Sequence, residues 1–251
     1  MPLPESLLIL ASPFAGMLAG WLAANWRLEG LQRLGPPACE ACGRKPGWTA
    51  WTPFLDVALM RGRCPACQAP AGWLQTVCEM AGILVSLSAL AFAPAGTLIL
   101  SCLFGWTLLA LAAIDWRTFL LPNVLTFLAV ALGLLMLCLT KPINWPDHLI
   151  GGAAGYLLLL AVELFYRYSR GRDGLGRGDA KLLGALGLWI GWQGLPDILL
   201  VSSLCALIAA LLMSWRSGES LRGTTALPFG PWLALAGWTI WLTGPLMALL
   251  S

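Results

Sequence analysis

The chain has 251 residues, of which 59% are hydrophobic and only 11% are charged, and its formal net charge at neutral pH is +3. Soluble globular domains carry about 25% charged residues, so this composition excludes that class of protein. The small positive charge gives no reason to expect nucleic acid as a partner.

Apolar runs of about 17–25 residues are typical of membrane-spanning helices, and the chain has roughly eight such runs. They cover residues 6–24, 73–93, 96–114, 121–139, 149–166, 180–195, 197–214 and 228–249. The first run is too long for a removed signal peptide, and no clear cleavage site follows it. We therefore predict an all-α polytopic membrane protein with about eight transmembrane helices.

The expected organisation has three parts: a first transmembrane helix over residues 1–24, an insert over residues 25–72, and a seven-helix core over residues 73–251. The insert is rich in Gly, Pro and Trp and is too short to build an apolar core of its own. Segments this small usually need a metal or a disulfide to hold them together.

The basic residues predict the orientation of the helices. If the N-terminus faces away from the cytoplasm, 14 of the 15 Lys and Arg residues fall in cytoplasmic segments and only Lys141 lies outside. Cytoplasmic loops of membrane proteins carry this excess of positive charge. The insert over residues 25–72 is then cytoplasmic.

Four of the eight cysteines form two C-x-x-C pairs inside the insert, with 21 residues between the pairs. They are Cys39, Cys42, Cys64 and Cys67. This spacing suits a four-cysteine zinc site, and the alternative is a pair of redox-active disulfides. Because the cytoplasm keeps thiols reduced, the predicted topology favours zinc. The other four cysteines lie in apolar runs, where we expect small core residues.

Four acidic residues lie within or at the edge of the predicted helices, all toward the cytoplasmic side: Glu79, Asp115, Glu163 and Asp179. A charge at the centre of a bilayer costs roughly 2.5–3.5 kcal/mol on insertion scales, so each needs a reason to be there. Glu163 can pair with Arg167 four residues later on the same helix. Glu79 can be a buried packing or hydrogen-bonding acid.

Asp115 ends the third predicted helix and Asp179 opens the sixth, within the stretch "GLGRGDAKLLGALG". Structural alternatives are a pair of Asp115 with Arg117 and a helix N-cap at Asp179. Two carboxylates on one membrane face are also what an aspartic protease needs, with one protonated and one ionised. Helix dipoles favour Asp179 as the anion and Asp115 as the acid. Gly176 and Gly178 would let a substrate backbone approach Asp179.

The sequence lacks the residues that other classes of hydrolytic active site require. The only histidine is His148, in a loop predicted to lie outside, so a Cys–His or Ser–His system on the cytoplasmic face is excluded. The H-E-x-x-H pattern of zinc proteases is also missing.

Five segments resemble motifs of the bacterial prepilin peptidases, also called type IV leader peptidases, in that family's order. "GRGDAKLLGALGLWIGW" is similar to the G-x-G-D-x-K-L-L signature, and "IDWRTFLLPNVLT" to the second aspartate motif. "CEACGRKPGW…RGRCPAC" resembles the tetracysteine segment, "VCEMAGIL" the helix that follows it, and "LPFGPWLALAG" the C-terminal motif. The resemblance covers about residues 38–240.

The resemblance implies an intramembrane aspartic endopeptidase that removes the leader from type IV prepilins or type II secretion pseudopilins, cutting after a glycine on the cytoplasmic side. Many members then methylate the new N-terminus with S-adenosylmethionine. It implies the catalytic pair Asp115 and Asp179, zinc on Cys39, Cys42, Cys64 and Cys67, and supporting roles for Gly176, Gly178, Lys181 and Glu79, the last in methyl transfer. Membrane lipids are expected partners, and the oligomeric state stays open.

The implied location is the bacterial inner membrane, with a periplasmic N-terminus and the active site facing the cytoplasm. One stretch departs from the family. "LAGWLAANWRLEG", after the first helix, lacks the usual G-S-F-L-N-V-type motif with Arg-Leu-Pro, and this bears on methyl transfer. Two other classes remain: a non-enzymatic membrane scaffold whose zinc insert docks a secretion partner, and a membrane thiol oxidoreductase that uses the two C-x-x-C pairs.

Overall fold

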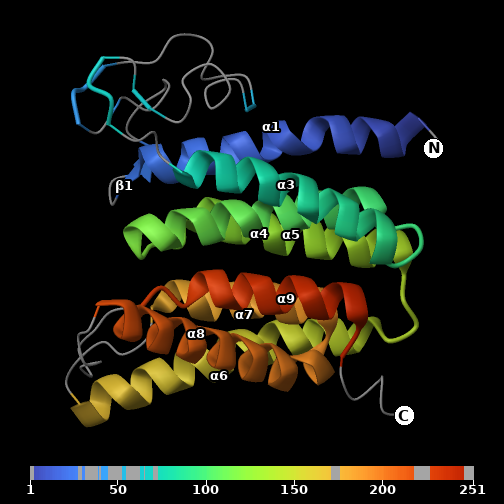
Figure 1. The fold of residues 1–251 in the computed structure, drawn as a ribbon. Coiled ribbons are helices and arrows are strands. Elements are labelled where there is room, and N and C mark those ends of the chain that lie inside the picture. Colours follow the sequence, from blue (N-terminus) through green and yellow to red (C-terminus); the bar gives the residue numbers. More distant parts are fainter. Residues whose placement is uncertain are drawn as a thin grey trace. The chain divides into compact units, whose positions relative to one another are not determined.

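The computed structural model describes residues 3–27, 30–31, 39, 41–44, 53–54, 63–64, 66–69, 73–170, 176–217 and 227–245. Eight α-helices fall within these residues, as the apolar runs predict (Figure 1). They are α1 (Leu3–Asn25), α3 (Trp73–Phe92), α4 (Leu98–Thr118), α5 (Asn123–Thr140), α6 (Trp145–Arg170), α7 (Arg177–Ile190), α8 (Leu195–Ser217) and α9 (Gly230–Thr243). Much of the predicted insert lies outside the described residues, so its extent stays a prediction.

Two short strands follow α1 and were not expected from the sequence. β1 (Trp26–Arg27) pairs antiparallel with β2 (Gly30–Leu31), with Trp26 opposite Leu31. A single-turn 3₁₀ helix, Trp192–Gly194, separates α7 from α8.

Six helices of the described chain are long and apolar enough to cross a membrane, whereas α7 and α9 have only 14 residues each. At 1.5 Å per residue, 14 residues extend about 21 Å, which is shorter than the ~30 Å hydrocarbon core. The short length of α7 is explained by its surroundings, because ten of its residues are buried by protein. Its C-cap is Gly191, whose φ of +91° suits glycine.

Contacts between residues divide the chain into two compact units, residues 1–118 and 119–251. In the first unit, α1, α3 and α4 contact one another (Figure 1). The small residues of "GMLAG" let α1 and α3 approach closely: a Cβ on Gly16 would overlap the carbonyl of Cys78 in α3. A Cβ on Gly82 would in turn lie 2.5 Å from the carbonyl oxygen of Ser12 in α1.

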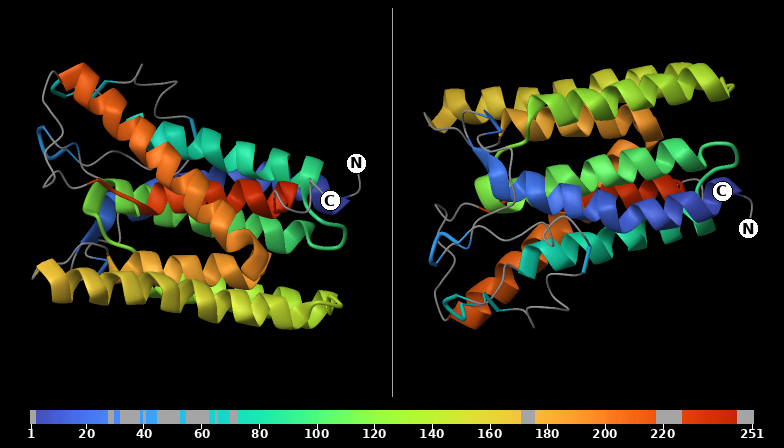
Figure 2. Two further views of the ribbon diagram at one scale, coloured as in Figure 1. Left: turned by 90° about the horizontal axis from the view of Figure 1, so that it is seen from below. Right: turned by 90° about the horizontal axis from the view of Figure 1, so that it is seen from above.

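In the second unit, α7 contacts α5, α6, α8 and α9. The small residues of "GGAAG" place Gly151 of α6 backbone to backbone with Gly187 of α7. Figure 2 shows these two helices side by side. The Trp189 indole N–H donates to the Ala129 carbonyl of α5 at 2.9 Å, and its ring meets Trp241 of α9 edge-on at 5.0 Å. The helix that carries Asp179 is therefore held on several sides.

Candidate active site and metal centre

Asp179 lies in the first turn of α7 and its residue is only 8% exposed. The helix begins at Arg177 with Gly176 as its N-cap, and the Asp179 N–H donates to the Gly176 carbonyl at 3.0 Å. The prediction that Asp179 is the N-cap is therefore wrong: Gly176 is the N-cap, and Asp179 lies within the first turn that follows it. In the first turn the positive end of the helix dipole favours the ionised carboxylate.

Gly176 and Gly178, which flank Arg177, have different structural roles. A Cβ on Gly176 would lie 3.1 Å from Oδ2 of Asp179, so glycine keeps the space beside this carboxylate open. A Cβ on Gly178 would lie 2.7 Å from the Cβ of Leu121. Gly178 is thus needed to pack α7 against the segment between α4 and α5, whatever its part in substrate approach.

Asp115 lies one turn before the end of α4, and its residue is 5% exposed. Asp115 belongs to the first compact unit and Asp179 to the second, and their pairing stays a prediction.

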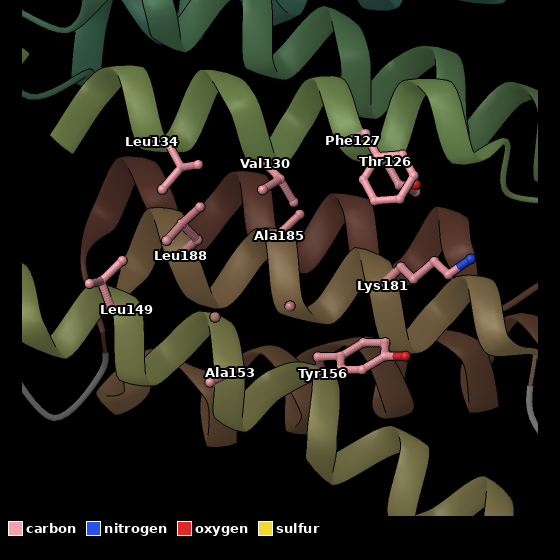
Figure 3. A pocket seen from close by; sticks show the side chains of 12 residues that line it. Thr126, Phe127, Val130, Leu134, Leu149, Ala153, Tyr156, Lys181, Ala185 and Leu188 are labelled. Carbon is pink, nitrogen blue, oxygen red and sulfur yellow. The ribbon is translucent and has the colours of Figure 1, made fainter. Parts of the chain in front are cut away.

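Lys181 lies on a different face of α7 from Asp179. Its Nζ donates to Oδ1 of Asn123 at 2.6 Å, which links the starts of α7 and α5. Lys181 also lines an apolar groove of about 390 Å³ between α5, α6 and α7, together with Gly184, Ala185 and Leu188 (Figure 3). At 3.6 residues per turn, Asp179 is rotated about 200° from Lys181. Lys181 therefore supports the helix from the side opposite the aspartate.

Glu163 of α6 makes the ion pair expected from its sequence and a second one. Its Oε1 accepts from Nη2 of Arg167 at 2.6 Å, which confirms the predicted pair, and from Nε of Arg177 at 3.3 Å. Its Oε2 is buried and has no hydrogen-bond partner among the described residues. The link to Arg177 was not anticipated, since the two residues meet only when α6 and α7 fold back on each other.

Glu79 is buried in α3 and both of its oxygens accept hydrogen bonds. Oε2 accepts from the backbone N–H of Phe54 at 2.9 Å and Oε1 from Nε2 of Gln75 at 3.2 Å. Gln75 also donates to the Met17 carbonyl of α1 at 3.1 Å. The prediction of a buried hydrogen-bonding acid is confirmed. Glu79 attaches residue 54, within the predicted insert, to the helices.

The four cysteines of the two C-x-x-C pairs come together, although they are far apart in sequence. All four sulfurs lie within 4.8 Å of one another, and none of these cysteines forms a disulfide. Sγ of Cys39 is 3.7 Å from that of Cys67, and Sγ of Cys42 is 3.8 Å from that of Cys64. The group can bind a metal ion.

The two C-x-x-C turns repeat the same backbone hydrogen bonds. In each, the N–H of the first cysteine donates to the carbonyl five residues later, and the N–H four residues later donates back to the first cysteine's carbonyl, all at 2.8–2.9 Å. Backbone N–H groups of Cys67 and Ala66 lower the pKa of the Cys64 thiol to about 6, and the same arrangement lowers the pKa of Cys39. A lowered thiol pKa favours the thiolate, which is the form that binds metals.

Family models match both the segment with the two aspartates and the segment with the four cysteines. The model of the type IV leader peptidase family matches residues 102–211, which include both aspartates. The model of the bacterial peptidase A24 N-terminal domain matches residues 22–92, which include the four cysteines and Glu79. No solved structure matches the chain.

Curated relatives extend over most of the chain, and each is named prepilin leader peptidase/N-methyltransferase. The Dickeya chrysanthemi protein is 35% identical over 86% of this chain and 81% of its own length. The Pseudomonas putida protein is 34% identical over 89% and 82%, respectively. The Aeromonas hydrophila protein is 39% identical over 76% of this chain and 66% of its own length.

Proposed function

Because the chain belongs to the type IV leader peptidase family, we propose that it cleaves the leader peptide from prepilins or pseudopilins and methylates the new N-terminus. The family and the six span-length helices make it a multi-pass protein of the bacterial inner membrane. The observation that carries the proposal is the buried aspartate in the first turn of α7, with an open space at Gly176 beside its carboxylate.

Asp115 and Asp179 act together as the catalytic pair. The ionised Asp179 takes a proton from water, and the protonated Asp115 donates a hydrogen bond to the scissile carbonyl. Their locations support this division, since Asp179 is near the positive end of α7 and Asp115 near the negative end of α4.

The substrate helix enters sideways from the bilayer, with its leader on the cytoplasmic side. The N-terminus of the enzyme lies in the periplasm, as the distribution of Lys and Arg indicates. Scission occurs close to the cytoplasmic surface, the side to which the basic residues assign both aspartates.

The metal is zinc, held by Cys39, Cys42, Cys64 and Cys67. A tetrahedron of sulfurs with Zn–S bonds of about 2.3 Å has S–S edges of about 3.8 Å, close to the two cross-pair distances in the structure. The ion is structural, because four protein ligands leave no open coordination position. It joins two distant parts of the predicted insert.

Methyl transfer uses S-adenosylmethionine as the donor. Glu79 supports it indirectly, since both carboxylate oxygens are engaged by protein groups that attach residue 54 to α3. The mass of the processed N-terminus measures this activity, and cleaved product without the added methyl group would leave a peptidase only.

The test of the peptidase is co-expression with a prepilin. Asp115→Asn and Asp179→Asn should each leave the prepilin uncut, while Asp147→Asn, which changes an acid at the other end of the second unit, should cleave normally. Normal cleavage by either of the first two variants would reject the aspartic protease and favour the scaffold.

A further inference from the structure

One face of α6 follows α7 along its length. The contacts pair Gly151 with Gly187, Gly155 with Leu183, and Glu163 with Arg177. The residue numbers of α6 rise as those of α7 fall, so the two helices run antiparallel, and the α6 residues repeat at spacings of four and eight. The contact between Glu163 and Arg177 therefore lies at the end of the interface where α7 begins.

The bond at this end joins a buried acid to an exposed base. The Glu163 side chain is 2% exposed, whereas that of Arg177 is 63% exposed, and Nε lies 3.3 Å from Oε1. Within the described part of the chain, the ion pair of Arg177 is with Glu163. A carboxylate as buried as that of Glu163 is costly to remove from water, so a purely structural site would have little reason to keep it.

Arg177 occupies the centre of the turn that leads to Asp179. Glycines flank it at positions 176 and 178, and glycine gives a backbone more conformational freedom than any other residue. A contact with another helix can therefore restrict this turn and keep Asp179, the third residue of α7, in one position. The side chain of Arg177 makes this contact, through its ion pair with Glu163 of α6.

We propose that Glu163 is a positioning residue for the peptidase: through Arg177 it holds the first turn of α7 and so keeps the Asp179 carboxylate in its reactive position. This inference rests on the proposed function of Asp179. It assigns Glu163 no contact with the substrate, so substrate binding should be unaffected when the link is broken.

The experiment measures kcat and KM of the full-length enzyme in detergent with a defined prepilin. Glu163→Gln and Arg177→Met should each lower kcat about tenfold or more, because small displacements of a catalytic group are costly, and leave KM within about twofold. If the two residues act as one unit, the double variant should be no slower than the slower single variant. Arg177→Lys, which keeps the charge, should recover part of kcat.

Arg167→Met is the matched control, because Arg167 binds the same carboxylate oxygen at 2.6 Å but lies on α6 itself. It should keep kcat within about twofold of the wild type if positioning of α7 is what matters. An equal loss in Arg167→Met, multiplied losses in the double variant, or wild-type kcat in Arg177→Met would each overturn the proposal.

Two further measurements separate the possible failures. Thermal unfolding shows whether Glu163→Gln has kept its fold. If it has not, the kcat of Arg177→Met decides the outcome, because replacing an exposed side chain should leave the fold intact. Asp179→Asn is run alongside: wild-type cleavage by this variant would reject the peptidase itself, whereas lost cleavage with unaffected Arg177 variants would reject only the positioning role.

Discussion

Gly178 shows at the residue scale how one position can carry two explanations. The sequence suggests that the missing side chain admits a substrate backbone to Asp179. In the structure, an added Cβ would lie 2.7 Å from the Cβ of Leu121, so a packing requirement exists before any substrate is present. The two explanations predict different results for the same substitution.

Gly178→Ala should lower the free energy of unfolding by about 1–3 kcal/mol, because the new methyl group overpacks against Leu121. The measurement is thermal or denaturant unfolding in detergent, alongside prepilin cleavage. Adding Leu121→Ala should restore part of both stability and cleavage. If the single variant is stable and cleavage stays lost in the double variant, the methyl group obstructs the substrate instead.

The contact of α6 with α7 is the clearest feature at the scale of elements. Gly151 and Gly187 meet backbone to backbone, so any side chain at Gly187 must separate the helices. The neighbouring Gly152 has room, since its Cβ would be 3.4 Å from the nearest atom. Gly187 and Gly152 therefore form a matched pair for a substitution experiment.

Gly187→Ala should destabilise the protein by about 1–3 kcal/mol or more through overpacking, with a lower thermal midpoint. Gly152→Ala should change stability by less than about 1 kcal/mol, because alanine fits and is the better helix former. Equal midpoints for the two variants would contradict the close contact of α6 and α7.

The two C-x-x-C turns form a second element, for which the metal can be measured directly. Purified protein should hold about one zinc ion, and Cys39→Ser combined with Cys64→Ser should release it, since the ligand set falls from four thiolates to two. Cys138→Ser, which changes an exposed cysteine on α5, should keep the full zinc content by elemental analysis. Protein without metal and with disulfides under native conditions would favour the redox reading.

At the scale of the whole molecule, the distribution of basic residues determines the proposed topology. Lys141 is the single basic residue assigned to the periplasmic side, whereas Arg216 near the end of α8 belongs to the cytoplasmic side. The reason is the excess of Lys and Arg in cytoplasmic loops.

Lys141→Cys should react with a membrane-impermeant maleimide in cells with a permeable outer membrane, above the level of the wild-type protein. Ser217→Cys, next to Arg216, should react only after the inner membrane is opened. The reverse pattern would place the N-terminus in the cytoplasm and move the proposed site to the wrong face for leader cleavage.

Sequence alone determined the features that depend on local pattern. Hydrophobic length predicts a helix wherever it occurs, so all eight helices were found, although the predicted ends of α7 and α9 lie too far along the chain. Spacing likewise predicted the cysteine cluster, and the i,i+4 rule predicted the pair of Glu163 with Arg167. Motif order was enough to indicate the family.

Tertiary structure alone decided which distant residues meet. Glu163 finds Arg177 because α6 and α7 fold back on each other, Glu79 finds the Phe54 N–H across the insert, and Gly178 meets Leu121. No local periodicity encodes such contacts, since they depend on the direction and close approach of segments far apart in the sequence. For the same reason the short length of α7 could not be predicted, because burial by neighbouring helices replaces the lipid that otherwise sets the length of a span.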